Sequence, residues 1–147
     1  MDVAWEFTVI DGAIIAAAVV FLVLVSVVQY YWKKTKAPDQ LDRKYIRKQW
    51  KKIEDLFSYG KEMNFKLAVI EADKVLDYVL KELNYPGDTM ADRLKIASYE
   101  HRNLNSVWWA HKVRNQVVHD IKYIIKHGET KKVLGLFKKA LKELRAI

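Results

Sequence analysis

The chain of 147 residues contains no cysteine, two prolines and five glycines. The absence of cysteine excludes disulfide scaffolds, thiolate metal sites and thiol nucleophiles. We find no glycine-rich phosphate loop, no internal repeat and no low-complexity tract. No segment alternates apolar and polar residues long enough to predict a strand. The sequence therefore predicts an all-α fold, with room for one compact domain and an anchor.

The N-terminal part also lacks basic residues. All 26 lysine and arginine residues follow Trp32, whereas Asp2, Glu6 and Asp11 precede or open an apolar run. Residues 33–147 carry 26 basic and 15 acidic side chains, a balance of +11, against +8 for the whole chain. A basic surface of this kind suits anionic lipid, nucleic acid or an acidic protein, and it is equally typical of a solvated, lysine-rich helical surface.

Residues 9–32 form the longest apolar run, and within residues 13–28 the only polar side chain is Ser26. As a helix, these 24 residues would span about 36 Å, which exceeds the bilayer's hydrocarbon thickness of about 30 Å. The run ends in an aromatic belt and a basic cluster: Tyr30, Tyr31, Trp32, Lys33, Lys34 and Lys36. Acidic residues before the run and basic residues after it predict a single-pass membrane protein, with the N-terminus outside and the C-terminal domain cytoplasmic.

A cleaved signal peptide is the alternative interpretation of the run. It requires a basic start, a shorter apolar core and small residues at the cleavage site. Here the start is acidic and the run ends in bulky aromatic residues. The pattern therefore favours a retained anchor.

The chain organises into an anchor (1–36), a basic juxtamembrane helix (37–61) and a helical bundle (62–147). We expect Asp39 to cap the basic helix, with Asp42 in its first turn, and Gly60 to end it. Its apolar positions recur at helical spacing, and between them lie Arg43, Lys44, Arg47, Lys48, Lys51 and Lys52. These side chains are candidates for binding lipid or nucleic acid, although the helix can also dock on the bundle with its lysines in water.

The bundle is expected to be a small up-down arrangement of helices with short connections. The apolar period and the turn residues predict helices over about 64–83, 89–98 and 105–126, and from 129 or 130 to the C-terminal end. Thr89 resembles the first residue of a capping box. Gly128 is expected to provide the left-handed cap that ends the third of these helices.

The stretch W-W-A-H-K-V-R-N-Q-V-V-H-D, residues 108–120, carries the most chemistry. Asn115 and His119 are one helical turn apart on one face, His111 continues that stripe, and Arg114 is adjacent. An imidazole titrates near neutral pH and can move the proton of a ribose 2′-hydroxyl or of a leaving oxygen. A guanidinium can hold a phosphate through two hydrogen bonds. Together they form a candidate site for cutting RNA without a metal.

This stretch resembles the hallmark of the HEPN superfamily, R-x(4 to 6)-H with a polar residue after the arginine; Arg114 to His119 match its shortest form. The preceding long helix, turn and short helix resemble the same layout. The chain is also similar to membrane-anchored bacterial proteins of unknown function that carry A-x-x-x-A-D-K-x-L-D and W-x-A-H-K-x-R-N-x-x-x-H, here residues 68–77 and 108–119. The likeness covers about residues 62–145.

The resemblance implies a homodimer in which two motif helices face each other. Arg114 and His119 would be catalytic, forming one composite cleft that cleaves RNA to a 2′,3′-cyclic phosphate. By their chemistry and positions, rather than by the resemblance, we expect Asn115 and His111 to support this site, together with Glu71 and Asp73 of the preceding helix. Many members of the superfamily have lost catalysis, so a non-catalytic homodimeric interaction or scaffolding module at the membrane is the alternative.

Each highlighted residue has a structural alternative as well. Arg114 could pair with Glu71 or Asp73, His119 could pair with Asp120 or Glu71, and His111 is expected to be mainly structural. Trp108 and Trp109 are expected to be core and interface aromatics rather than platforms for bases. The four histidines are scattered, so no metal site and no cofactor are expected.

Overall fold

The computed structural model describes residues 9–35 and 41–147; within the first helix it describes the side chains of residues 12 and 14–29. In chain order the elements are α1 (Val9–Thr35), α2 (Arg43–Ser58), α3 (Glu62–Glu82), α4 (Met90–Glu100), the 3₁₀ helix η1 (Arg102–Ser106), α5 (Val107–His119) and α6 (His127–Glu143). The described residues contain no strand. The all-α prediction is confirmed.

The chain divides into two compact units between residues 37 and 38. The first unit contains α1, whose large apolar side chains from Ile14 to Val28 are mostly 43–65% exposed. Within the part of the chain that the structure describes, no helix combines the length and apolar character needed to cross a membrane. The expected aromatic belt and its basic cluster lie outside the described side chains.

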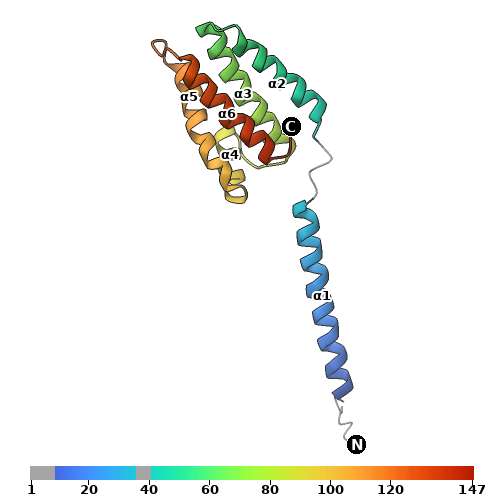
Figure 1. Cartoon of the computed structure of the whole chain (residues 1–147). Helices are drawn as coiled ribbons and strands as arrows, with labels where there is room; N and C mark the ends of the chain where they lie inside the picture. Colours follow the sequence, from blue (N-terminus) through green and yellow to red (C-terminus); the bar gives the residue numbers. More distant parts are fainter. Residues whose placement is uncertain (1–8, 36–40) are drawn as a thin grey trace, which may run out of the picture. The chain divides into compact units, whose positions relative to one another are not determined.

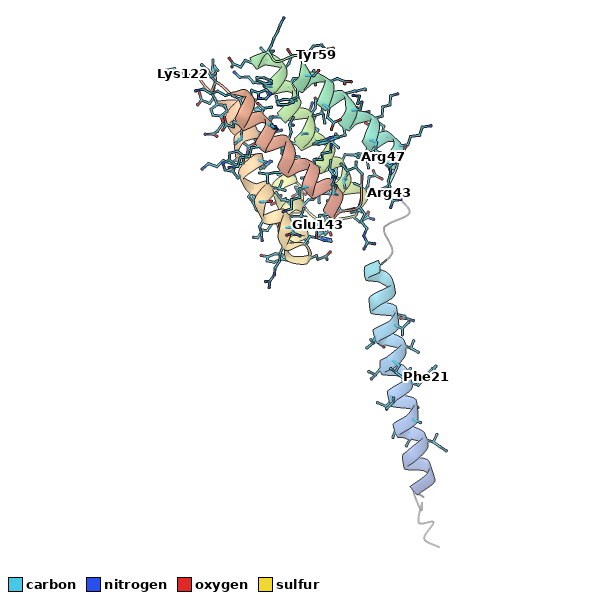
Figure 2. The ribbon with its side chains drawn as sticks, in the orientation of Figure 1. Phe21, Arg43, Arg47, Tyr59, Lys122 and Glu143 are labelled. Atoms are coloured by element: carbon cyan, nitrogen blue, oxygen red, sulfur yellow. The ribbon has the colours of Figure 1, made fainter. Side chains whose placement is uncertain are left out.

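The second unit is a helical bundle in which α3 packs against α2, α4, α5 and α6 (Figure 1). The long helices alternate in direction, since Arg43 and Glu143 lie at one end of the bundle and Tyr59 and Lys122 at the other (Figure 2). The largest fully buried side chains come from every long helix of the unit: Phe137, Ile46, Ile53, Leu76, Leu80, Leu94, Leu104, Ile125, Leu141, Val69, Val79 and Val107. The expected up-down bundle is confirmed.

Helix α2 docks on the bundle through its apolar positions. Ile46, Trp50 and Ile53 are buried at the expected spacing, and burial of each such side chain contributes about 1.5–3 kcal/mol. Asp42 is the N-cap, and its side chain accepts a hydrogen bond from the Tyr45 amide. The predicted cap, Asp39, lies outside the described residues. The basic helix thus belongs to the same unit as the helices that follow it.

The α3–α4 turn is held by Arg93, which is only 6% exposed. Its Nε donates to Asp77 Oδ1 at 2.9 Å, and its Nη1 donates to the carbonyl of Gly87. Gly87 has φ +144°, and a Cβ there would lie 2.5 Å from the Cβ of Asp92. Thr89 and Asp92 form the predicted capping box. A buried guanidinium and a glycine-only backbone therefore fix the start of α4.

The predicted helix over 105–126 is wrong at its C-terminal end. Helix α5 stops at His119, because Asp120 turns to an extended conformation and its side chain accepts a hydrogen bond from the Lys122 amide at 2.9 Å. Such local side-chain bonds compete with helix continuation. Helix α6 already begins at His127, so Gly128 is in its first turn rather than a left-handed cap.

Candidate functional site

Helix α5 positions the motif because one of its faces belongs to the core. Val107, Ala110, Val113 and Val117 are buried at spacings of three and four residues, so they form a single stripe. The helix packs on α3 and α6 through that stripe. The polar residues of the motif are consequently held at the edge of the interface or in solvent.

Asp73 of α3 is the centre of the polar contacts of the motif. It is 3% exposed. One carboxylate oxygen lies 2.7 Å from His111 Nδ1, and the other lies 3.3 Å from Arg114 Nε. A carboxylate only accepts hydrogen bonds, so Nδ1 of His111 carries the proton in this contact. The predicted pairing of Arg114 with Asp73 is thereby confirmed.

Glu71 does not join this cluster. It pairs with Lys74 at 2.7 Å on the exposed side of α3. Two positions along a helix correspond to a rotation of about 200°, so Glu71 and Asp73 point in nearly opposite directions. Glu71 is therefore wrong as a partner of Arg114.

The guanidinium of Arg114 is partly solvated, with 26% of the side chain exposed. Its Nη1 donates to Asn115 Oδ1 at 2.9 Å. Its Nε is buried and makes no hydrogen bond, although it faces the Asp73 carboxylate as an ion pair. Because Asn115 shares a face with His119, this contact turns the guanidinium toward that face.

His119 is the last residue of α5 and is exposed. Among the described residues it forms no hydrogen bond or ion pair that would hold its ring. The predicted alternative, a pairing with Asp120 or Glu71, is wrong, because Asp120 bonds the Lys122 amide and Glu71 bonds Lys74. The imidazole is therefore open to solvent at the end of the motif helix.

The two tryptophans of α5 are not buried. Trp108 and Trp109 are each 37% exposed, so the predicted core role is wrong for both, and the interface role stays a prediction. Lys132 lies 4.4 Å above the Trp109 ring, an arrangement that attracts a cation to the ring face. Trp108 instead makes an edge contact with the His111 ring, with centroids 6.5 Å apart.

The basic residues of α2 lie mostly in solvent. Lys44, Arg47, Lys48, Lys51 and Lys52 are exposed. Arg43 is half-buried, and its Nε donates to the carbonyl of Arg145 at 2.9 Å. Lys51 pairs with Asp55 at 3.2 Å, and Lys52 donates to Gln49 at 3.3 Å. Among the described residues, Lys44, Arg47 and Lys48 form no such contact and face solvent, whereas Arg43 also holds α2 to the C-terminal residues.

Titratable groups outside the motif have shifted pKa values. Burial, helped by a hydrogen bond to Glu129, raises the pKa of Tyr123 to about 12. Burial and a bond to Glu100 raise the pKa of Tyr85. The bond from Lys138 lowers the pKa of Glu54.

The structure also has a pocket that the sequence reasoning missed. Its volume is about 520 Å³, and its lining comes from α4, η1 and α5: Lys95, Ser98, Tyr99, Arg102, Asn105 and Trp108. The available signal was the spacing of residues 95, 98, 99 and 102, which recur at helical intervals. We call this pocket the α4–α5 groove.

Within the described residues, no group of three or more histidine, aspartate or glutamate side chains could hold a metal ion. The chain matches no family model, no curated protein and no solved structure.

Proposed function

We propose that the chain is a membrane-tethered helical domain of the HEPN type that cuts RNA without a metal. The observation that carries the proposal is the 2.9 Å bond from Arg114 to Asn115. This bond brings a guanidinium to the helix face that ends with the exposed imidazole of His119. A phosphate binder and a proton carrier thus share one side of α5.

The chemistry follows from these two groups. The imidazole of His119 takes the proton of a ribose 2′-hydroxyl, and the 2′-oxygen attacks the adjacent phosphorus. The bond from phosphorus to the 5′-oxygen breaks, and a protonated imidazole gives that oxygen its proton. The products are a 2′,3′-cyclic phosphate and a 5′-hydroxyl. Arg114 stabilises the charge that develops on the phosphoryl oxygens.

Two proton transfers on opposite sides of one phosphate call for two imidazoles. Each chain supplies a single histidine on this end of α5, so a homodimer with facing motif helices would bring the second. Asp73 would act as a positioning residue, because its carboxylate contacts both Arg114 and His111. The dimer also follows from the superfamily resemblance.

The anchor is part of the same proposal. The large apolar side chains of α1 from Ile14 to Val28 are mostly 43–65% exposed, and a bilayer would cover them. The acidic-to-basic order of the flanking residues favours a bundle on the cytoplasmic side. The exposed lysines of α2 follow the anchor directly, and each would add about 1 kcal/mol beside anionic lipid.

Topology can be tested directly because the chain contains no cysteine. Single substitutions Asp2→Cys and Lys122→Cys would be labelled with an impermeant maleimide in intact cells. We expect labelling of the first variant only, and of both after permeabilisation. Equal labelling of both in intact cells would refute the proposed orientation.

Cleavage can be tested with the full chain purified in detergent. Single-stranded RNA should be cut in EDTA, with cyclic phosphate ends, and His119→Gln should reduce the rate at least a hundredfold, since positioned acid–base catalysis contributes about 10²–10⁴-fold. The matched control is His101→Gln, because His101 pairs with Glu143 at 3.6 Å, outside the motif. Intact RNA across all four homopolymers, or equal rates for both variants, would refute the nuclease.

One observation favours the second candidate, a non-catalytic homodimeric module at the membrane. Arg114 Nε is buried against Asp73, which is the arrangement of a structural ion pair. In that case Arg114→Ala would change the mass measured by sedimentation away from that of a dimer. His119→Ala would leave both this mass and the function unchanged.

A further inference from the structure

The α4–α5 groove combines aromatic and cationic side chains. Of its aromatic residues, Tyr99 is 74% exposed and Trp108 is 37% exposed. The volume of about 520 Å³ falls within the range of about 300–1,000 Å³ that small-molecule and cofactor sites occupy. Two aromatic surfaces therefore border a hollow of ligand size.

The charged side chains that line the α4–α5 groove are all basic. Lys95 and Arg102 line it, and its lining contains no acidic residue. The nearby acidic side chains have other partners, since Glu100 accepts a bond from Tyr85 and Glu143 accepts one from Asn103. Within the described residues, neither cation of the groove forms an ion pair. Both charges therefore remain available to an anion.

One residue of the groove, Trp108, lies on the same face of α5 as the motif. Trp108 precedes His119 by eleven residues. On a helix this corresponds to three full turns plus about 20°, so the two residues lie on nearly the same face, about 16 Å apart along the axis. His111 and Asn115 lie between them on that stripe, and the His111 ring touches the Trp108 ring. An extended ligand in the groove would therefore lead along α5 toward His119.

We propose that the α4–α5 groove binds single-stranded RNA, with Tyr99 and Trp108 stacking on bases and Lys95 and Arg102 holding phosphates. Aromatic rings beside cations are the combination that binds single strands without sequence preference. The groove is the binding subsite for the substrate of the proposed function, and in this sense the inference rests on it. The backbone of the strand would run from the groove to the imidazole.

The experiment measures binding separately from cleavage. The probe is a short fluorescein-labelled 2′-O-methyl oligouridine, which lacks the attacking hydroxyl and cannot be cut by the proposed chemistry. Its affinity for the full chain in detergent is measured by fluorescence anisotropy. Loss of one stacking ring weakens binding roughly 5- to 150-fold, so we expect this effect for Tyr99→Ala and for Trp108→Ala.

The basic side chains of the groove, Lys95 and Arg102, can be tested through the salt dependence of probe binding. Loss of one phosphate contact to a single strand lowers the salt slope of log K by about 0.7, so Arg102→Ala should produce that change. The matched controls are Tyr59→Ala and Lys139→Ala. Tyr59 is 67% exposed at the other end of the bundle, and Lys139 is exposed on α6. Both should bind like the parent chain. Tyr99→Ala is the primary variant, because its exposed ring can be removed without opening the core.

The outcomes separate the two proposals. If His119→Gln abolishes cleavage and retains probe binding while Tyr99→Ala loses binding, both stand. If no RNA is cut but binding depends on Tyr99 and Arg102, the groove stands and the nuclease fails. Equal affinity of groove and control variants, no binding of the probe, or groove-dependent binding to phosphatidylserine vesicles without RNA binding would each overturn the groove proposal.

Discussion

Substitution of Asp73 is the most informative perturbation of the bundle. This residue is 3% exposed and contacts two cationic or protonated groups on α5, at 2.7 Å and 3.3 Å. Removal of one partner from a buried ion pair costs about 3–5 kcal/mol. We expect Asp73→Ala to lower the free energy of unfolding by about 3 kcal/mol, at the low end of this range, because Arg114 is 26% exposed and water reaches its outer nitrogens.

Asp73→Asn should cost less. Its amide oxygen can still accept the His111 proton, and a hydrogen bond contributes about 1 kcal/mol net. The expected loss is therefore about 2 kcal/mol. The matched control is Glu71→Ala on the same helix, whose partner is a surface lysine; an exposed pair contributes about 0–1 kcal/mol.

The assay is urea unfolding of residues 38–147, the unit that contains the whole described core, followed by far-UV circular dichroism. A double-mutant cycle of Asp73→Ala with Arg114→Ala should give a coupling free energy above about 0.5 kcal/mol. If Asp73→Ala lowers the free energy of unfolding by less than about 1 kcal/mol, or if the effects of the two single substitutions simply add in the double variant, the view that this carboxylate joins α3 to the motif is refuted.

Three further predictions concern the turn and the alkaline range. Gly87→Ala should lower the free energy of unfolding by about 1–3 kcal/mol, because its φ is +144° and a Cβ would meet Asp92 at 2.5 Å; an unchanged urea midpoint would contradict this. Arg93→Leu should lower it by about 1.5–3 kcal/mol, since Asp77 loses its charged hydrogen-bond donor but keeps Lys81 at 2.7 Å; a loss under about 1 kcal/mol would contradict the role of Arg93 in holding the turn. The pKa of Tyr123, raised to about 12 above its usual 10, gives stability that is fully present below pH 10 and lost as the pH rises toward 12. Tyr123→Phe should therefore flatten the alkaline decline in thermal midpoint relative to the parent, and parallel curves would exclude the effect.

Helical periodicity predicted most of the bundle, because each long helix buries one stripe and leaves the rest in solvent. The buried stripe of α2 followed from the helical spacing of its apolar residues Ile46, Trp50 and Ile53. The capping box at Thr89 was equally local. The helical spacing of apolar residues and a capping motif could therefore be recognised in the sequence.

The end of α5 could not be predicted in the same way. Gly128 resembled a left-handed cap, while the decisive contact was the bond from Asp120 to the Lys122 amide. An aspartate can extend a helix or end it, and tertiary packing selects between the two. The choice here places His119 at a helix end instead of the middle of a long helix.

The candidate site was predicted in part. The motif followed from its spacing, and Asp73 was one of the two acids of the preceding helix that were expected to pair with Arg114. Glu71 could be distinguished from Asp73 only after the rotation of α3 was known. The α4–α5 groove was not predicted: four of its residues recur at helical intervals, but its lining comes from three elements whose mutual positions no local pattern encodes.

The bond from Arg43 to the carbonyl of Arg145 joins the first turn of α2 to the last residues of the chain. A force applied at the N-terminal end of α2 would act first on this bond and on the buried side chains of Leu41 and Ala146. Helix α2 packs mainly on α3, so such a force would act on the α2–α3 interface before it reached α5. The contacts that would bear this force first thus lie outside the helix that carries the motif.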